Sequence, residues 1–372
     1  MSKKKKQISS IKFSFSVLSI TIYLIISSIL IFCTFYFKQE IEGFLNYNSI
    51  TTTLDNDGLV MHTIEVGQAE AIIIKLPDNK NLMIDSGDDN NTSRQKVLSY
   101  LENNYFPLTD NKIIDYFILT HSDADHCGGV KEIFDEYEVK KVFRPKIYSS
   151  KYPYDYNLQT DHTKRMVNTN IYFNAITSIY NENCEISFSE AGIQIIESSY
   201  SITFYGPLQD YYDDVNEFSP IIVIEYNSKT IMLTGDATKN NEAEILDAYT
   251  LPEVDIYNAG HHGSKDSNSM NFLTEISPRY VVISCGLDNS YKHPHTETLN
   301  RLKEFTNDNF IFRTDKNGNI IVNIQSSGEI GVIVDVTTLN AYIKAEMMLA
   351  VVLIVLFSLF FARKTKNTKK TS

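Results

Sequence analysis

Residues 118–129 place two imidazoles and two carboxylates within six positions, directly after an apolar run and before a Gly-Gly pair. Four ionisable groups gathered at the end of a strand would repel one another or stay unsatisfied unless they shared a cation. On a tight loop, residues 121 and 123 can face one ion while residues 125 and 126 face a second. The stretch therefore predicts a metal-binding loop between a strand and a helix. A polar surface loop is the alternative.

Three further segments supply the ligands that such a site would still need. An apolar run at 231–234 leads to Asp236, and another at 254–258 leads to the pair His261 and His262. A loop stiffened by a proline carries His293 and His295. A Gly-Asp pair after a strand is more often a turn, whereas paired histidines beside the first motif favour a metal site.

Short apolar runs rich in Ile and Val, bounded by Gly, Asn, Asp or Pro, recur across residues 58–335 and predict strands. They lie at 59–66, 71–76, 81–84, 113–120, 193–205, 221–226, 230–234, 254–258 and 280–284. Candidate helices lie between some of them, at 92–103, 128–137, 240–249 and 296–305. Strands interleaved with helices predict one α/β (α+β) domain whose sheets are covered by helices.

Two uncharged apolar segments flank this domain. Residues 13–37 would be about 37 Å long as a helix, against a hydrocarbon core of about 30 Å, and predict a transmembrane helix. A cleaved signal peptide is the alternative. Residues 341–362 predict a second transmembrane helix in which Lys344 snorkels, with a buried core helix as the alternative. Residues 38–57 are polar and without periodicity, which indicates a linker.

The charge distribution predicts an orientation in a cell membrane. Residues 1–12 and residues 363–372 each carry five basic side chains. By the positive-inside rule both tips are expected to be cytoplasmic and the domain extracytoplasmic. The whole chain has a net charge of −12, so removing these ten cations leaves −22 on residues 13–362.

One region departs from this acidic background. Residues 139–165 hold seven basic side chains against two acidic ones, with four tyrosines interleaved. Alternating basic and aromatic residues could bind a single-stranded nucleic acid or another anionic polymer. A solvated insertion loop is the alternative.

The motifs resemble those of the metallo-β-lactamase superfamily, whose signature is His-x-His-x-Asp-His, here with Asp123 in the second place. More closely, the chain is similar to the hydrolase domain of ComEC-like DNA-uptake competence proteins. Their opening Asp-Val-Gly-Gln-Gly-Asp-Ala corresponds to residues 65–71 and their Ile-Asp-Thr-Gly to residues 84–87, and the later motifs recur in order. The resemblance covers residues 58–335 and implies a four-layer αββα sandwich with the metal site at one edge of two packed sheets.

Carried over position by position, the resemblance implies two divalent metal ions. It assigns His121 and Asp123 to the first ion, Asp125 and His126 to the second, Asp236 as the bridge, and His262 or its neighbour His261 as the completion of the second site. The third-motif histidine of the family is missing, and the segment 216–219 stands there with Asn216 as a possible substitute. Because oxygen ligands then predominate, the two ions are expected to be either Zn²⁺ or Mn²⁺.

The resemblance also implies the catalytic groups. Asp125 would orient a metal-bridging hydroxide, and His293 and His295 would contact substrate or protonate a leaving oxygen. Asp85 and Ser264 are expected to lie close to the substrate.

These features predict a membrane-anchored, extracytoplasmic, dinuclear metal-dependent hydrolase of the phosphodiesterase or nuclease kind. DNA is the substrate that the resemblance suggests, although the net negative charge of residues 13–362 opposes the binding of phosphates. A hydrolase of cell-envelope phosphodiesters, such as teichoic acid or phospholipid head groups, is the first alternative. The second is a non-catalytic, metal-stabilised binding or sensing module, which the missing histidine favours. The expected partners are the membrane and a nucleic acid or an anionic envelope polymer, and protein partners stay open.

Overall fold

The computed structural model describes residues 58–106, 112–153 and 163–334. The chain divides into two units, 1–51 and 52–372, and every described residue belongs to the second. The predicted basic tips, linker and two transmembrane helices lie outside the described residues. In the part of the chain that the structure describes, no helix has the length and apolar character needed to cross a bilayer.

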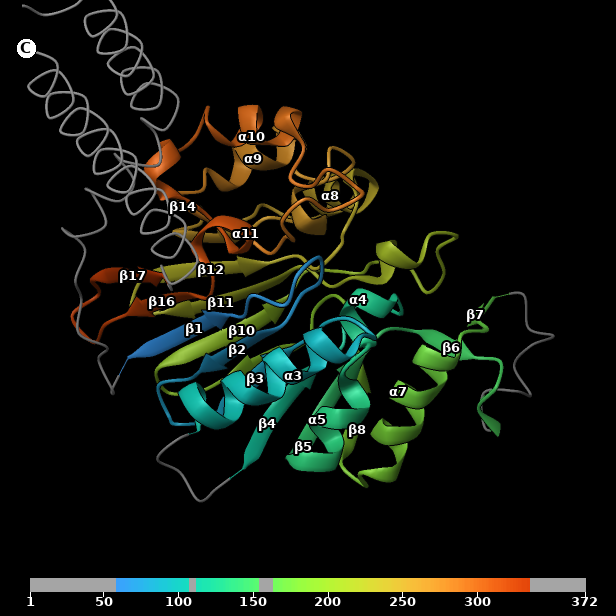
Figure 1. Ribbon diagram of the computed structural model, residues 1–372. Helices are drawn as coiled ribbons and strands as arrows, with labels where there is room; N and C mark the ends of the chain where they lie inside the picture. Colours follow the sequence, from blue (N-terminus) through green and yellow to red (C-terminus); the bar gives the residue numbers. More distant parts are fainter. Residues whose placement is uncertain (1–57, 107–111, 154–162, 335–372) are drawn as a thin grey trace, which may run out of the picture. The chain divides into compact units, whose positions relative to one another are not determined.

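An eight-stranded sheet forms the first half of the domain, in the order β17-β16-β1-β2-β3-β4-β5-β8 (Figure 1). Its strands are β1 (Leu59–Thr63), β2 (Ile72–Lys75), β3 (Asn81–Ile84), β4 (Ile113–Ile118), β5 (Glu138–Arg144), β8 (Glu185–Phe188), β16 (Ile320–Ile324) and β17 (Ile330–Val334). Strands β3, β4, β5 and β8 pair in parallel. Their carboxyl ends therefore meet at one edge of the sheet.

A seven-stranded sheet forms the second half, in the order β15-β14-β13-β12-β11-β10-β9. Its strands are β9 (Gln194–Ile196), β10 (Tyr200–Phe204), β11 (Ile222–Tyr226), β12 (Lys229–Leu233), β13 (Ile256–Asn258), β14 (Tyr280–Ile283) and β15 (Ile311–Arg313). Strands β12 to β15 pair in parallel, so their carboxyl ends also share one edge. A separate short pair joins β6 (Ile147–Ser149) to β7 (Arg165–Val167).

Helices cover one face of each sheet (Figure 1). The longer helices are α3 (Asn91–Tyr100), α5 (Val130–Glu136), α7 (Asn170–Asn181), α8 (Lys239–Ala248), α9 (Met270–Ile276) and α10 (Thr296–Leu302). The short ones are η1 (Leu101–Tyr105), α4 (Ala124–Cys127), η2 (Val215–Phe218), η3 (His261–Gly263), η4 (Asp308–Phe310) and α11 (Thr314–Asn317). Helices α3, α5 and α7 form one apolar core with the first sheet, and α8, α9 and α10 form another with the second.

Alternation along the strands shows a third apolar layer between the two sheets. Ile73 belongs to the core under α3, α5 and α7, while its neighbours Ile72 and Ile74 point to the opposite face and are equally buried. Across the gap, the Phe143 and Phe204 rings of the two sheets lie 5.1 Å apart. The layers therefore run helix, sheet, sheet, helix, and the predicted mixed α/β fold is confirmed.

Two predictions within the domain are corrected. The apolar run 193–205 is not one strand, because β9 and β10 fold back on each other as an antiparallel pair. Residues 139–165 are not one loop, because β5 is a parallel strand of the first sheet, between β4 and the edge strand β8. The lysines of β5 interrupt the apolar pattern by which a strand is predicted, although Val139, Val142 and Phe143 are buried and pack on both faces of the sheet.

Candidate metal centre

The first sheet delivers its part of the centre from two neighbouring parallel strands. Asp85 follows β3, and Thr120 and His121 follow β4. The backbone N–H of Thr120 donates to Asp85 Oδ1 at 2.9 Å, and the Thr120 hydroxyl donates to Asp85 Oδ2 at 2.7 Å. These bonds hold the loop of the sequence motif against the neighbouring strand end, and α4 begins directly after Asp123.

The second sheet delivers Asp236 after β12 and the adjacent histidines after β13. His261 and His262 both have left-handed backbones, with φ of 52° and 55°, which is uncommon outside glycine. The two rings consequently diverge, with centroids 6.3 Å apart and planes at 74°. The N–H of His261 donates to the carbonyl of Gly235 at 2.9 Å, which ties this turn to the one that carries Asp236.

Three buried histidines have their Nδ1 atoms engaged by the protein. His126 Nδ1 donates to Asp85 Oδ2 at 2.7 Å, and His262 Nδ1 donates to the carbonyl of Ser284 at 2.9 Å. His121 Nδ1 lies 3.0 Å from the Thr120 hydroxyl and 3.3 Å from the Ser219 hydroxyl. Bonding at Nδ1 fixes the ring orientation and leaves each Nε2 as the atom that can coordinate a metal.

The two oxygens of Asp236 face two separate groups of side chains. Oδ1 lies 3.2 Å from His126 Nε2 and 3.9 Å from His262 Nε2. Oδ2 lies 3.5 Å from His261 Nε2 and 4.0 Å from His121 Nε2. One carboxylate therefore lies between two clusters, as a bridging ligand would.

Each cluster includes one further carboxylate. Asp123 Oδ2 lies 3.8 Å from His121 Nε2, so His121, His261 and Asp123 are named the first cluster. Asp125 Oδ2 lies 3.3 Å from His262 Nε2, so Asp125, His126 and His262 are named the second cluster. The Asp125 side chain is 29% exposed and the Asp123 side chain 49% exposed, so both clusters are open to solvent on their carboxylate side.

The donor set fits divalent cations. His121 Nε2 is buried without a hydrogen-bond partner, which is costly for a polar atom unless a cation accepts its lone pair. The Nε2 atoms of His126 and His262 lie only 3.3 Å apart. Possible ligand atoms of His121, His126 and Asp236 all lie within 4.8 Å of one another, as do those of Asp125, His126 and His262. Nitrogen and oxygen ligands in such a set suit Zn²⁺ or Mn²⁺.

The electrostatics favour the metal-binding forms of His121 and Asp236, but the protonated form of His262. Burial lowers the pKa of His121 to about 3, so this ring is neutral. Burial disfavours the charged form of Asp236, but His126, His262 and His261 outweigh it and hold its pKa well below the usual range. Burial also opposes charge on His262, yet Asp236 and Asp125 raise its pKa to about 9. Metal binding would therefore displace a proton from His262.

His293 and His295 border the two clusters. The His293 ring centroid lies 5.5 Å from that of His261 and 6.2 Å from that of His262. Its Nδ1 lies 3.3 Å from Gln68 Nε2. His295 Nδ1 accepts from the backbone N–H of Lys265 at 3.0 Å, so the neutral ring carries its proton on Nε2.

The structure buries the two residues that were expected close to the substrate. Asp85 and Ser264 are both hydrogen-bonded within the protein. Asp85 holds His126 and Thr120, and the Ser264 hydroxyl accepts from the N–H of Asp266 at 3.2 Å. Their role is to position the loops that carry the ligands.

Sequence reasoning missed two residues of the centre. Ser219, rather than Asn216, touches the first cluster from segment 216–219, through His121 Nδ1 and through the N–H of Asp236 at 3.2 Å. The Asn216 Oδ1 is buried without a hydrogen-bond partner.

Glu70 is the second of these residues. It is buried, and one of its carboxylate oxygens lies within 4.8 Å of ligand atoms of Asp85 and His126. Ser219 lies in segment 216–219 and Glu70 lies in the motif at residues 65–71, so their positions in these motifs could have indicated them.

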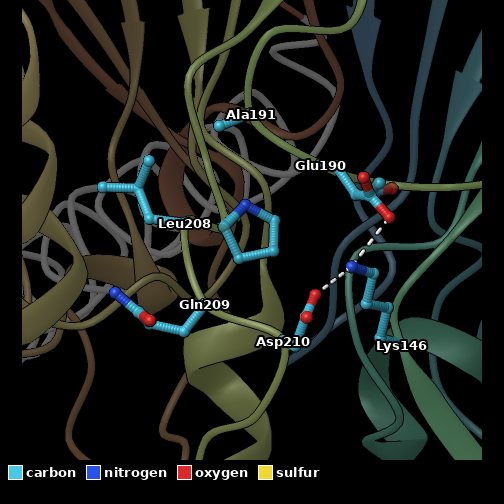
Figure 2. Close-up of a pocket in the computed structure, with 8 residues that line it drawn as sticks. Lys146, Glu190, Ala191, Leu208, Gln209 and Asp210 are labelled. Atoms are coloured by element: carbon cyan, nitrogen blue, oxygen red, sulfur yellow. Dashed lines mark hydrogen bonds and ion pairs between the residues drawn. The ribbon is translucent and has the colours of Figure 1, made fainter.

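The basic residues after Val139 are largely neutralised. Lys140 pairs with Glu138, and Lys141 Nζ lies 2.6 Å from Glu185 Oε1. Figure 2 shows Lys146 between two carboxylates, those of Glu190 and Asp210, in a small polar pocket. Arg144 is fully buried among aromatic rings. These cations are therefore poorly placed to neutralise the phosphates of a bound polymer.

Comparison with known proteins identifies the family. A model described as the metallo-beta-lactamase superfamily matches residues 64–286, more than half of the 372 residues. The chain belongs to the metallo-β-lactamase superfamily.

Among individual relatives, the chain is 26% identical over 267 residues to ComE operon protein 3 of Bacillus subtilis, covering 69% of this chain. It is also 26% identical over 246 residues to Recombination protein 2 of Haemophilus influenzae, covering 65% of this chain. These matches confirm the predicted similarity to ComEC-like competence proteins, yet they span only 32% and 26% of those relatives. Among solved structures, the metallo-beta-lactamase fold protein YhfI of Bacillus subtilis is 10% identical, with a TM-score of 0.42, and the match covers 72% of this chain and 99% of YhfI.

Proposed function

We propose that this chain is a membrane-anchored, extracytoplasmic phosphodiesterase that uses two divalent metal ions. The observation that carries the proposal is the position of Asp236, whose two oxygens face different pairs of histidines. A carboxylate shared in this way is the arrangement that holds two ions side by side. Because this geometry does not depend on the missing third-motif histidine, the loss of that histidine is no argument for a binding module.

The first cluster would hold one ion and the second cluster the other, with Asp236 between them. His261 then supplies the nitrogen that the missing histidine would have given, because its Nε2 lies on the same side of Asp236 as His121. The first ion would meet two nitrogens and the oxygens of Asp123 and Asp236. This mixed set is compatible with Mn²⁺ as well as Zn²⁺.

The side chains around the clusters supply the remaining chemistry. When bound, two divalent ions provide an activated water and neutralise charge on a phosphoryl group. Asp125 is positioned to accept a hydrogen bond from the attacking water, because its side chain is partly exposed beside His262. His295 presents its Nε2 proton, since Nδ1 is occupied by Lys265, and can protonate a leaving oxygen together with His293.

The proposed location in the cell membrane is inferred from the amino-acid sequence. Segments 13–37 and 341–362 would anchor the chain in the cell membrane, with basic tips on the cytoplasmic side and the domain outside. The relatives named for competence and recombination favour a nucleic acid as substrate over an envelope polymer.

Turnover of a simple phosphodiester tests the proposal. The 372-residue chain is purified in mild detergent, loaded separately with Mn²⁺ and Zn²⁺, and assayed on bis-p-nitrophenyl phosphate. We expect metal-dependent hydrolysis, and a loss of kcat of at least about 100-fold in Asp125→Asn with unchanged circular dichroism. Asp247→Asn, an exposed change on α8, serves as the control that retains activity. No turnover with either metal in a folded, metal-loaded chain would contradict the proposal and favour the binding module.

A further inference from the structure

The loop before His293 exposes two large apolar side chains. Leu287 is 72% exposed and Tyr291 is 64% exposed. Exposed apolar side chains are common when scattered singly, but these two share one short loop beside the candidate metal centre. Their position makes them candidates for contact with a ligand at the metal centre.

Hydrogen bonds hold this loop in place. Asn289 Nδ2 donates to the carbonyl of Gly286 at 2.8 Å and to that of His293 at 2.6 Å. The N–H of Gly286 donates to Gln68 Oε1 at 3.0 Å, and a side chain at Gly286 would collide with the backbone of Gln68. The backbone of the loop is therefore fixed to the domain, so little backbone entropy is lost when a ligand binds there.

Aromatic rings connect Tyr291 to the second cluster. The Tyr291 ring stacks on that of His293, with centroids 5.6 Å apart and planes at 25°. His293 in turn lies 6.2 Å from His262, with planes at 27°. A row of three rings thus runs from a candidate metal ligand to the surface. The outermost ring is the one left open to solvent.

Lysines without carboxylate partners lie around the same loop. Within residues 58–106, 112–153 and 163–334, no carboxylate pairs with Lys292 or with Lys265, whose N–H contacts His295. Both lysines are exposed, and Asp288 is the one carboxylate of segment 286–295. This contrasts with Lys140, Lys141 and Lys146 near β5, which are all paired. A flat exposed ring beside unpaired cations is the combination that binds single-stranded nucleic acid.

We propose that Tyr291, with Leu287 and Lys292, forms a base-stacking subsite for a single-stranded nucleic acid. The inference rests on the proposed phosphodiesterase function and names residues that would bind its nucleic-acid substrate. A base stacks on the open surface of Tyr291 with its edge against Leu287, Lys292 neutralises an adjacent phosphate, and the next phosphate lies at the metal centre. A polyol phosphate of the cell envelope has no flat ring for Tyr291.

The test compares Tyr291→Ala, Tyr291→Phe and the control Tyr249→Ala, a partly exposed tyrosine at the end of α8. The first measurement is the affinity for a short fluorescein-labelled oligothymidylate, by anisotropy, with Asp125→Asn added to each chain to prevent cleavage. The second is kcat/KM for thymidine 5′-p-nitrophenyl phosphate against methyl p-nitrophenyl phosphate, a diester without a base. Together they separate stacking from catalysis.

We expect Tyr291→Ala to weaken oligothymidylate binding by about 5- to 150-fold, the range for losing one stacked base. Its loss of kcat/KM should be at least about fivefold greater on the nucleotide diester than on the methyl diester. Tyr291→Phe should retain both properties, because it keeps the ring, and Tyr249→Ala should match the parent chain.

Three results would overturn the subsite. They are unchanged oligothymidylate binding in Tyr291→Ala, equal losses on the two diesters, and displacement of the oligonucleotide by polyglycerol phosphate as effectively as by unlabelled oligothymidylate. If the parent chain hydrolyses neither diester with either metal, the proposed function fails. The binding measurement then still decides whether Tyr291 stacks a base.

Discussion

Two adjacent histidines take different places at this centre. His261 faces Asp236 Oδ2 in the first cluster, and His262 faces Asp236 Oδ1 in the second. The left-handed backbone at both residues separates the rings, so one dipeptide serves both sides of the bridging carboxylate. This explains how a chain without the third-motif histidine keeps a second nitrogen in its first cluster.

Asp85 orients His126 from outside the ligand set, and its replacement leads to a prediction about metal affinity. Asp85→Asn removes the charge that holds His126 Nδ1, so we expect metal affinity to fall by about 10- to 100-fold. Isothermal titration of Mn²⁺ and Zn²⁺ into the metal-free chain measures this, with Asp247→Asn as the control. Unchanged affinity in a folded Asp85→Asn chain would show that the Asp85 contact does not support the site.

Sequence alone pointed to most of the side chains that the structure brings together here, but not to their arrangement. His121 and His126 stood out because ionisable groups gathered at the end of an apolar run need a cation, whereas Asp236 was assigned through the family resemblance. The division between His261 and His262 depends on backbone dihedral angles, which a residue pattern does not specify. The contact of Ser219 with His121 joins two distant segments, so no local spacing could indicate it.

At the scale of elements, parallel strands gather the site, because their carboxyl ends share an edge in each sheet. Among the parallel strands, apolar runs predicted β3, β4, β12, β13 and β14 but missed β5, β8 and β15. In β5, Lys140 and Lys141 interrupt the apolar pattern and pair with neighbouring glutamates. A strand that carries charge at its solvent-facing positions is easily mistaken for a loop.

Strand β1 leads to a prediction about pH. His62 is buried there with its Nδ1 2.8 Å from the Tyr100 hydroxyl, and burial lowers its pKa to about 4 from a usual 6.5. The unfolded chain therefore binds a proton between these pH values that the folded chain does not. Stability is unaffected above pH 6.5 and falls by up to roughly 3 kcal/mol as the pH drops towards 4.

Replacing His62 isolates this contribution from the other titrating groups. His62→Gln should reduce the loss of unfolding free energy between pH 6.5 and pH 4 by a large part of that amount, measured by urea denaturation at each pH. Parallel pH profiles for the two chains would contradict the assignment.

At the scale of the whole domain, neither half contains the centre by itself. The first sheet supplies Asp123, Asp125 and two histidines, and the second supplies Asp236, His261 and His262. Residues 13–362 carry a charge of −22, so a polyanionic substrate would be attracted only locally, at the metal ions and the unpaired lysines. Binding of such a substrate would therefore depend mainly on the metal centre.

The number of metal ions bound by each chain shows whether the centre is dinuclear. The metal-free chain is titrated with Mn²⁺ by calorimetry, and the bound metal is then quantified by elemental analysis, for the parent chain and for His261→Ala. We predict two ions per parent chain and one per His261→Ala chain, because the first cluster loses a nitrogen ligand while the second stays complete. A single ion in the parent chain, or two ions in His261→Ala, would contradict the shared-carboxylate centre with His261 as a ligand.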